Sequence, residues 1–338
     1  MEPATARVPS RPVEDHAIYD LQYRRHTLPV TALAQELGLF SLLETSPMSL
    51  ADLAATLCIS ARACEVLITV CMALGFLERH ADATIALTAT ACTYLLPSSP
   101  FCYGPLLPPD DPALATLRRA VHAAEHAGEQ KAVNMGALPL DQVRAFIRRM
   151  HLLALPAATA LAEQPSFAAV RRLLDVGGGS GALSCAVAQA HPTLRATLMD
   201  LTPVCEVARE LIAGYGLGTR VHCVVADMLR DPWPREHDAI LFGNIFHDWE
   251  DATCRVLARQ AAAALQPGGR VFLHEMLLDE QKDGPLTVAC FSVNMLLYER
   301  GRQYTARELC GFLEDAGFID CRSTPTFGYY HLIEAHKP

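Results

Sequence analysis

The sequence lacks a long apolar run. Of its 338 residues 51% are hydrophobic, but polar residues interrupt them before any stretch reaches the roughly 20 residues of a membrane span. The first 15 residues contain no apolar segment of the kind that forms a signal peptide. We therefore expect a cytoplasmic protein without a membrane partner.

Positive charge is scarce as well. Lys and Arg together number 28 against 37 Asp and Glu, which gives a formal net charge of −9. Because phosphate backbones are bound by clusters of basic side chains, this balance argues against nucleic acid as the main partner.

The 12 cysteines form neither a CxxC motif nor a cluster with histidines at metal-ligand spacing. Disulfide frameworks are typical of short secreted chains, whereas this chain is long. We expect reduced, mostly buried thiols and no metal site.

The first third of the chain has the pattern of a small helical domain. We expect a mobile arm over residues 1–15 and a dimerisation domain over residues 16–100. Residues 16–43 have helical apolar spacing that Pro29 interrupts. This interruption predicts a kinked or split helix.

Residues 49–57 and 61–74 have the spacing of a helix–turn–helix, and two short β-type segments follow, as in a winged helix. Ser60 is the expected N-cap of the second helix, and Gly75 the residue just after it. Only two basic residues lie between positions 44 and 90, too few for contacts with DNA phosphates. Because the second helix is apolar along most of its length, we favour a dimer interface over DNA binding.

The rest of the chain has the pattern of an α/β domain. Residues 101–165 begin with a proline-rich loop and continue with helical patterns at 113–126 and 140–164, which we expect to link the domains and shape an acceptor pocket. In residues 166–338, β-type segments alternate with helices, which predicts a parallel sheet with helices on both faces. The expected strands are 172–176, 196–199, 221–225, 239–242 and 271–275.

A glycine-rich turn follows the first of these strands. Asp175 lies near the strand end, and Gly177, Gly179 and Gly181 alternate through the turn into the next helix. Glycines allow positive φ angles and a close approach of a ligand to the backbone, and the free N–H groups of a helix start favour an anionic group. Taken alone, the pattern fits either NAD or S-adenosylmethionine.

The ends of the next two strands favour S-adenosylmethionine. Asp200 ends the second strand, where either cofactor would offer ribose hydroxyls. Asp227 follows the third strand, beside the expected adenine position, with Met228 as an apolar lid. This third acidic position fits S-adenosylmethionine better than NAD.

The fourth strand leads to His247 at the carboxyl edge of the sheet, where ligands bind in open α/β folds. An imidazole there can take a proton from a hydroxyl group, and Glu275, at the end of the fifth strand, is placed to orient it. The alternative is structural: Asp248 caps the next helix and His247 lies in the preceding turn.

Taken together, these motifs resemble those of the S-adenosylmethionine-dependent small-molecule O-methyltransferases of the caffeic-acid and acetylserotonin type, in particular their bacterial natural-product branch. The resemblance runs from about residue 16 and includes Asp-Val-Gly-Gly-Gly-Ser-Gly at 175–181, Phe-His-Asp-Trp-Glu-Asp at 246–251 and Leu-Gln-Pro-Gly-Gly-Arg at 265–270. It implies a Rossmann-like class I methyltransferase sheet after a mainly α, winged-helix-like dimerisation domain. It also implies a homodimer, no metal, and a small aromatic acceptor whose hydroxyl His247 deprotonates.

The resemblance also assigns the site residues. The expected cofactor contacts are Asp175, Gly177, Gly179, Asp200, Leu201, Asp227, Met228, Gly243 and Asn244. The expected acceptor-pocket residues are Phe146, Met150, His151, Trp249, Phe291, Asn294 and Met295. For these pocket residues the alternative is ordinary core packing, and His151 could equally be a helix histidine with its own partners.

Two positions depart from the family pattern. Gly243 stands where many plant members have a lysine, and Gln303 stands where they have a second glutamate beside the base. Glutamine can orient an imidazole but cannot offset the charge that it gains. Carbon or nitrogen methylation driven by alignment therefore stays open beside oxygen methylation, as does a regulator that binds S-adenosylmethionine without turnover.

Overall fold

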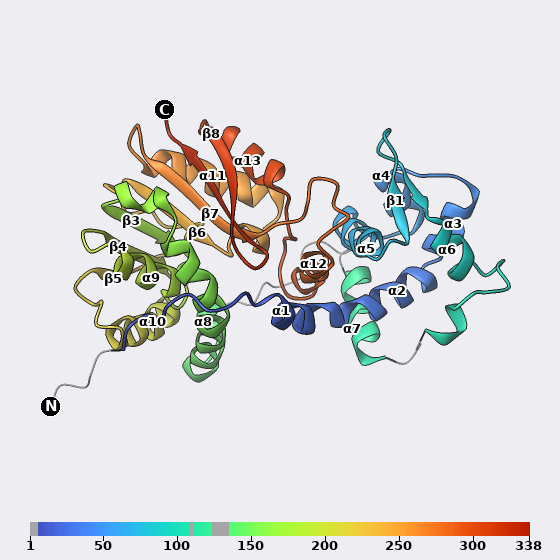
Figure 1. Cartoon of the computed structure of the whole chain (residues 1–338), viewed down its shortest axis with the longest axis horizontal. Coiled ribbons are helices and arrows are strands. Elements are labelled where there is room, and N and C mark those ends of the chain that lie inside the picture. Colours follow the sequence, from blue (N-terminus) through green and yellow to red (C-terminus); the bar gives the residue numbers. More distant parts are fainter. Residues whose placement is uncertain (1–5, 108–110, 124–134) are drawn as a thin grey trace. The chain divides into compact units, whose positions relative to one another are not determined.

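The computed structural model describes residues 6–107, 111–123 and 135–338 (Figure 1). The chain divides into two compact units. Unit 1 comprises Met1–His16, Asn134–Met276 and Ala306–Pro338, and unit 2 comprises Ala17–Val133 and Leu277–Thr305.

This division differs from the predicted boundary at residue 166 in one important place. The segment Leu277–Thr305, expected within the catalytic domain, belongs to unit 2. The Arg62 guanidinium donates hydrogen bonds to the carbonyls of Glu299 and Gly301, both at 3.0 Å. Such contacts between residues far apart in the sequence hold the segment in unit 2, and no local sequence pattern predicts them.

Unit 1 is built on a seven-stranded sheet in the order β5-β4-β3-β6-β7-β9-β8 (Figure 1). Strands β5, β4, β3, β6 and β7 pair parallel with one another in that order, whereas β9 runs antiparallel to both β7 and β8. The strands are β3 Arg172–Val176, β4 Arg195–Asp200, β5 Val221–Val225, β6 Ala239–Gly243, β7 Arg270–Met276, β8 Ile319–Phe327 and β9 Tyr330–His336. The strand order reverses between β3 and β6, so the carboxyl ends of these two strands are where a ligand is expected.

Helices cover the sheet of unit 1. Helices α8 Leu140–Ala162, α9 Ala182–Ala190 and α10 Thr202–Gly214 pack together, and α11 Asp251–Ala264 packs on α13 Ala306–Glu314 (Figure 1). The central strands are apolar because both faces of a parallel sheet are covered; Leu173, Leu198 and Leu241 are fully buried. Short 3-10 turns, η4 Met135–Ala137, η5 Pro165–Ala169 and η6 Phe246–Asp248, complete the unit.

The predicted mobile arm is wrong for its described part, residues 6–15. Val8 is buried, its N–H donates to Gln189 Oε1, and Gln189 Nε2 donates back to the Val8 carbonyl, both at 2.9 Å. Ala6 N–H donates to the carbonyl of Gly214. Burial of one apolar side chain and pairing of the backbone therefore fix this segment on unit 1. Residues 1–5 of the predicted arm lie outside the described residues.

Unit 2 is mainly helical. Its elements are α1 His16–Tyr23, η1 Arg24–His26, α2 Thr27–Glu36, α3 Leu39–Thr45, α4 Leu50–Thr56, α5 Ala61–Ala73, β1 Leu77–Arg79, β2 Ile85–Leu87, α6 Ala89–Tyr94, η2 Gly104–Leu106, α7 Pro112–Ala123 and α12 Leu286–Tyr298. The part of the predicted helix 113–126 that follows α7 lies outside the described residues.

The helix–turn–helix pattern is confirmed in its local detail. Ser60 Oγ accepts the N–H of Ala63 at 3.1 Å, and Gly75, at φ +73°, follows α5. Strands β1 and β2 pair antiparallel after it. The predicted split of the first helix also occurs, but at η1, because Pro29 lies in the first turn of α2, where a missing N–H costs nothing.

Across the described residues, no single helix combines the length and the apolar character needed to cross a membrane. The bent pair α4 and α5 meets those two criteria only when its helices are counted together.

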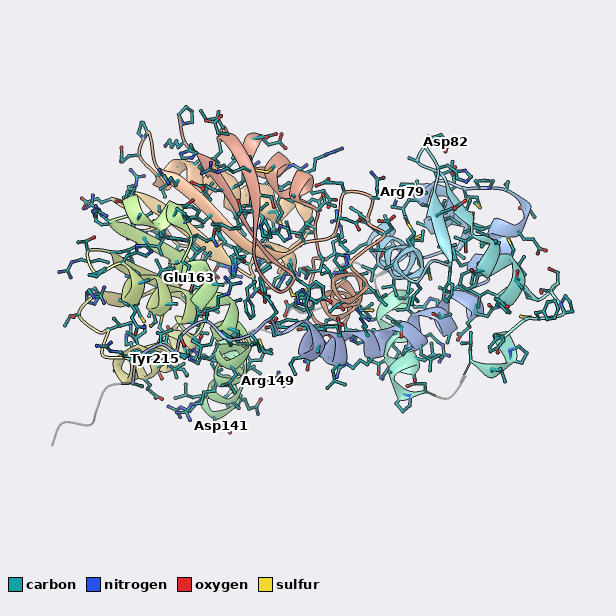
Figure 2. All side chains as sticks on the ribbon, in the orientation of Figure 1. Arg79, Asp82, Asp141, Arg149, Glu163 and Tyr215 are labelled. Carbon is teal, nitrogen blue, oxygen red and sulfur yellow. A yellow bond between two sulfur atoms is a disulfide. The ribbon has the colours of Figure 1, made fainter. Side chains whose placement is uncertain are left out.

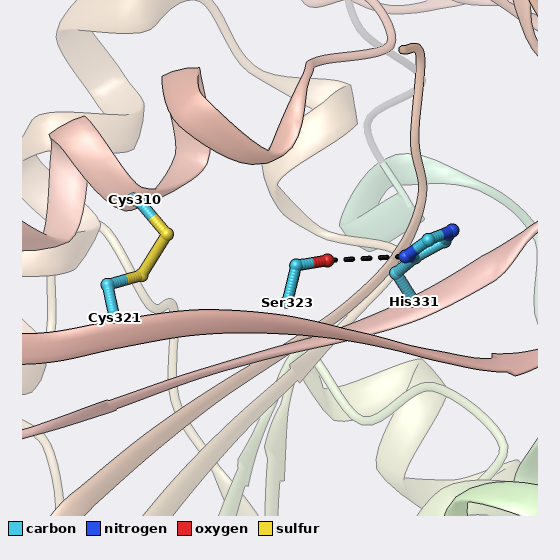
Figure 3. Close-up of a disulfide and its surroundings, with 4 residues drawn as sticks. All are labelled: Cys310, Cys321, Ser323 and His331. Carbon is cyan, nitrogen blue, oxygen red and sulfur yellow. Dashed lines mark hydrogen bonds between the residues drawn. A yellow bond between two sulfur atoms is a disulfide. The ribbon is translucent and has the colours of Figure 1, made fainter. Parts of the chain in front are cut away.

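The expectation of reduced thiols is wrong for one pair. Cys310 in α13 and Cys321 in β8 form a disulfide (Figure 3). Their Cα atoms are 5.7 Å apart, within the range that a disulfide spans. The turn that brings the end of α13 back to β8 creates this proximity, and the spacing of 11 residues alone did not reveal it. Six of the free cysteines are buried, as expected.

Reduction of this bond, or its removal by Cys310→Ser, is expected to lower the free energy of unfolding by about 3 kcal/mol, because the unfolded chain loses a short closed loop. Chemical denaturation with and without reductant measures the difference. Cys58→Ser, at an exposed free thiol, is the matched control and should have no effect. A wild-type denaturation midpoint that does not respond to reductant would contradict the prediction.

Candidate active site

The glycine turn between β3 and α9 has the backbone that only glycine adopts readily. Gly177, Gly179 and Gly181 have φ values of +67°, +55° and +75°. A Cβ at Gly177 would lie 2.5 Å from Ile245 Cδ1, so no side chain fits there. At Gly179, by contrast, a Cβ would meet only the Gly177 carbonyl, at 4.0 Å. The space beside Gly179 is therefore open to a ligand.

Asp200, at the end of β4, is tied to this turn. Its Oδ2 accepts the N–H of Gly179 at 2.9 Å, and its Oδ1 accepts the N–H of Leu201 at 2.7 Å. Burial raises the pKa of Asp200 to about 6, although the two backbone bonds favour the ionised form. The carboxylate thus joins the turn to the neighbouring strand while each oxygen keeps a lone pair for a further donor.

Asp175 is buried beneath the turn rather than exposed at its edge. Its Oδ2 accepts a hydrogen bond from Ser184 Oγ at 2.6 Å, and burial raises its pKa to about 6. Its Oδ1 is buried and has no hydrogen-bond partner among the described residues. The expected ligand contact of Asp175 stays a prediction, and Ser184 is a partner that the sequence did not suggest.

The loop after β5 is held by its own side chains. Asp227 Oδ1 accepts the N–H of Leu229 at 2.9 Å, and Asp231 Oδ2 accepts the N–H of Asp227 at 2.8 Å. Trp233 Nε1 donates to the Met228 carbonyl at 2.9 Å. The Met228 sulfur lies 3.8 Å from the place that a Cβ of Gly177 would have. Met228 is therefore next to the glycine turn, and its role as an apolar lid stays a prediction.

The end of β6 leaves no room for a side chain at Gly243. A Cβ there would lie 2.0 Å from Leu183 Cδ1, which fills the position where the plant-type lysine would begin. The next residue, Asn244, has φ +55° and donates from Nδ2 to the Tyr330 hydroxyl at 3.1 Å. Its Oδ1 is buried without a partner among the described residues. Tyr330, a residue of the terminal hairpin, is another partner that the sequence did not suggest.

His247 lies in η6, directly after β6, and is buried between two carboxylates. Its Nδ1 is 3.0 Å from Glu275 Oε2, and its Nε2 is 3.2 Å from Asp248 Oδ1. The other oxygen of Glu275 accepts the N–H groups of Ile245 and Phe246, both at 2.9 Å. Glu275 therefore fixes both the loop and the imidazole. The structural alternative for Asp248 is wrong, since α11 begins after Glu250.

The charge on His247 results from opposing effects. Burial lowers the pKa of His247, but the carboxylates of Glu275 and Asp248 together raise it well above its ordinary value. The raised pKa favours the protonated form of the resting imidazole. The ring acts as a base only after that proton has left Nε2.

Four of the expected acceptor-pocket residues lie in unit 1. The His151 ring is buried, with Nδ1 3.0 Å from Ser180 Oγ and Nε2 2.8 Å from the Tyr215 hydroxyl. It therefore contacts the glycine turn and has its own partners, as the alternative of a helix histidine predicts, and its pocket role stays a prediction. Phe146 is 36% exposed beneath the guanidinium of Arg149 (Figure 2) and lies off the buried face of α8. For Met150 and Trp249, both partly buried, the pocket role stays a prediction.

The other expected residues lie in unit 2 on α12 and the loop after it. The ring of Phe291 stacks on Tyr23 with centroids 4.4 Å apart, and Asn294 Oδ1 is 3.1 Å from His26 Nε2. Met295 is buried. Tyr23 and His26 were not predicted, although their spacing of three residues places them on one helical face.

Gln303 is buried, and its backbone N–H donates to Ser292 Oγ at 3.1 Å. Its side-chain amide has no hydrogen-bond partner among the described residues. Because Gln303 belongs to unit 2 and His247 to unit 1, its role beside the base stays a prediction. Within the described part of the chain, no three His, Cys, Asp or Glu side chains gather as a metal site.

Comparison with known proteins decides the family. The O-methyltransferase domain matches residues 142–319, which include the glycine turn, His247 and Glu275. The 3-hydroxy-5-methyl-1-naphthoate 3-O-methyltransferase of Streptomyces sahachiroi is 36% identical over 299 residues, covering 86% of this chain and 85% of that protein. The chain belongs to the O-methyltransferase family. The O-methyltransferase dimerisation domain matches residues 30–97.

Solved structures agree with this assignment. An O-methyltransferase family 2 protein from Planctomyces limnophilus, in complex with apigenin, has a TM-score of 0.90 at 29% identity and covers 99% of this chain and 100% of its own. Human N-acetylserotonin methyltransferase in complex with S-adenosylmethionine has a TM-score of 0.59 at 25% identity and covers 96% and 98% of the two chains. The predicted family, fold class and enzyme class are confirmed: this O-methyltransferase has a class I methyltransferase fold after a helical dimerisation domain.

Proposed function

We propose that this O-methyltransferase transfers a methyl group from S-adenosylmethionine to a hydroxyl of a small aromatic acceptor, with His247 as the general base. The observation that carries the proposal is the placement of His247 between Glu275 and Asp248, directly after β6 and so beside the glycine turn that follows β3. A nucleophile activated there would face a donor bound at the point where the strand order reverses.

The residues of unit 1 fit this donor. When bound, S-adenosylmethionine supplies a methyl group on a positively charged sulfonium. Asp200 ends β4, as an acceptor for ribose hydroxyls requires, and Asp227 follows the adjacent strand β5, on the side expected for the adenine. The space beside Gly179 is open. The two buried, unpaired oxygens of Asp175 and Asn244 are acceptors that suit the ammonium end of the ligand.

The base chemistry belongs to three side chains. An acceptor hydroxyl replaces Asp248 at Nε2 of neutral His247, its O–H bond breaks, and the proton moves to Nε2 as the oxygen takes the methyl group. Glu275, 3.0 Å from Nδ1, holds the ring and stabilises the imidazolium that forms. Alignment of oxygen, methyl carbon and sulfur contributes the rest of the acceleration.

The comparisons support an aromatic acceptor and a dimer. A relative acts on a hydroxynaphthoate, and a structural neighbour holds apigenin; both are flat aromatic molecules. We place the protein in the cytoplasm as a homodimer formed through its matched dimerisation domain. Carbon or nitrogen methylation is the second candidate, favoured by Gln303 in place of a carboxylate.

Labelled S-adenosylmethionine, supplied with a panel of phenols, aminophenols and aromatic amino acids, tests the proposal. We expect label on an oxygen, located by NMR. Label found only on carbon or nitrogen would support the second candidate. The proposed function would be overturned if no methyl transfer were detected and calorimetry showed no heat with either the donor or S-adenosylhomocysteine.

The pH dependence of turnover is a separate prediction. Because the pKa of His247 is raised, its basic form appears only above that pKa, so kcat/KM for a hydroxyl acceptor should rise with pH and level off above the usual histidine range. Asp248→Asn removes a carboxylate 3.2 Å from Nε2, which lowers the pKa of His247 and should move the rise to lower pH. Steady-state rates from pH 5 to 10 measure both profiles. Superimposable profiles for the two proteins would contradict the prediction.

A further inference from the structure

We propose that His151 is a positioning residue for the donor site: by holding Ser180 it fixes the glycine turn and thereby sets the affinity for S-adenosylmethionine. The inference rests on the proposed function of that turn. It assigns to His151 a role different from the acceptor contact that the sequence suggested.

His151 lies on α8, outside the strand–turn–helix that contains the glycines. Its ring is 6% exposed, and each ring nitrogen has one hydroxyl partner, Ser180 Oγ at 3.0 Å and Tyr215 OH at 2.8 Å. Tyr215 directly follows α10 (Figure 2). The imidazole therefore connects α8, the end of α10 and the glycine turn through a single buried chain of hydrogen bonds.

A neutral imidazole completes this chain of hydrogen bonds. A neutral ring donates from one nitrogen and accepts at the other, whereas each hydroxyl can do either. Burial lowers the pKa of His151, which keeps the neutral form. Both nitrogens are occupied within unit 1, so no ring atom remains for an acceptor molecule.

Ser180 is the link between His151 and the ligand-facing backbone. It is 5% exposed and stands between Gly179, whose N–H is bound by Asp200, and Gly181, at φ +75°. Its Oγ also accepts the N–H of Ala182 at 3.4 Å. Asp200 thus restrains the turn from the β4 side, and His151 restrains it from the α8 side. Loss of the second restraint leaves a turn of flexible glycines held at one point.

Paired substitutions separate the two hydrogen bonds. An Asn side chain places its amide near the position of Nδ1, and Gln places its amide near that of Nε2. His151→Asn should therefore keep the bond to Ser180, while His151→Gln and His151→Phe should lose it. In calorimetric titrations with S-adenosylhomocysteine, we expect Kd to rise by about tenfold in the Gln and Phe variants, which corresponds to the loss of one buried hydrogen bond. In the Asn variant Kd should stay within about twofold of the wild-type value.

The separate effects on KM for the donor and on kcat distinguish a positioning role of His151 from a general contribution to protein stability. The Gln and Phe variants should raise KM for the donor while kcat at saturating donor stays within about twofold of wild type. Ser180→Ala removes the same contact from the other side and should raise Kd by the same factor, so the test survives if a His151 variant fails to fold. An effect confined to the acceptor KM would restore the acceptor-pocket role and overturn the inference.

If all four variants had the Kd of the wild-type protein and only a lower melting temperature, the inference would also be overturned, and His151 would be a residue of the core. Failure of the wild-type protein itself to bind S-adenosylhomocysteine is a different result, since it would overturn the proposed function. The wild-type titration, made first, separates the two failures.

Discussion

His247→Ala is expected to lower kcat for a hydroxyl acceptor by about 10²- to 10⁴-fold, the usual contribution of a positioned general base. The imidazole lies next to both Glu275 and Asp248 and can take the proton, whereas the glycine turn with Asp200 is formed by separate contacts. Affinity for S-adenosylhomocysteine should therefore stay within about twofold of wild type. Single-turnover rates and calorimetry measure the two quantities.

His247→Asn is the matched control for this prediction. Its amide can keep a contact with Glu275 from the position of Nδ1, so the site loses less of its structure, but it has no base. The Asn variant should lose as much turnover as the Ala variant while retaining more stability. Turnover near the wild-type rate in either variant would remove His247 from proton transfer and favour methylation by alignment.

Glu275→Ala is expected to have the largest effect on stability. The substitution removes the acceptor of two buried N–H groups, those of Ile245 and Phe246, and one of the two carboxylates that pair with His247. Leaving two buried donors without an acceptor and removing one of the two partners of a buried charge should lower the free energy of unfolding by about 2–5 kcal/mol. Turnover should fall as well, because the loop that carries His247 is no longer fixed. Chemical denaturation and steady-state rates measure both effects.

Glu275→Gln separates the two roles of this carboxylate. The amide oxygen can still accept the two N–H groups, so most of the stability should remain, but the negative charge is lost. The pKa of His247 should then fall, and the rise of kcat/KM should move to lower pH, as for Asp248→Asn. A Gln variant as unstable as the Ala variant would show that the charge, and not the backbone bonds, holds the loop.

Features of the site that depend on local pattern and strand order could be predicted from the sequence. Alternating strands and helices predicted a parallel sheet, and the carboxyl ends of parallel strands meet at one edge. That rule predicts His247 and Glu275 at the same edge, because His247 follows β6 and Glu275 lies at the end of the adjacent strand β7. The glycine turn could also be predicted, because the backbone freedom of Gly177 and Gly179 depends only on these residues themselves.

Features that depend on packing could not be predicted. The spacing on α8 placed His151 and Phe146 on one face, but His151 is buried and lies against Ser180, whereas Phe146 is partly exposed. No pattern in the sequence predicts that Glu275 accepts hydrogen bonds from two backbone N–H groups. The bond between Cys310 and Cys321 depends on how α13 returns to β8. Each of these contacts joins segments whose proximity arises only in the folded chain.

The space taken by Leu183 at the end of β6 limits how binding preferences can be transferred between branches of the family. A lysine introduced at position 243 to imitate the plant proteins would first have to displace a buried leucine on α9, since even a methyl group there would overlap Leu183 Cδ1. Engineering at this point therefore involves two positions at once, one on the strand and one on the helix. Single exchanges at Gly243 would measure the cost of moving the Leu183 side chain together with any effect of the ammonium group.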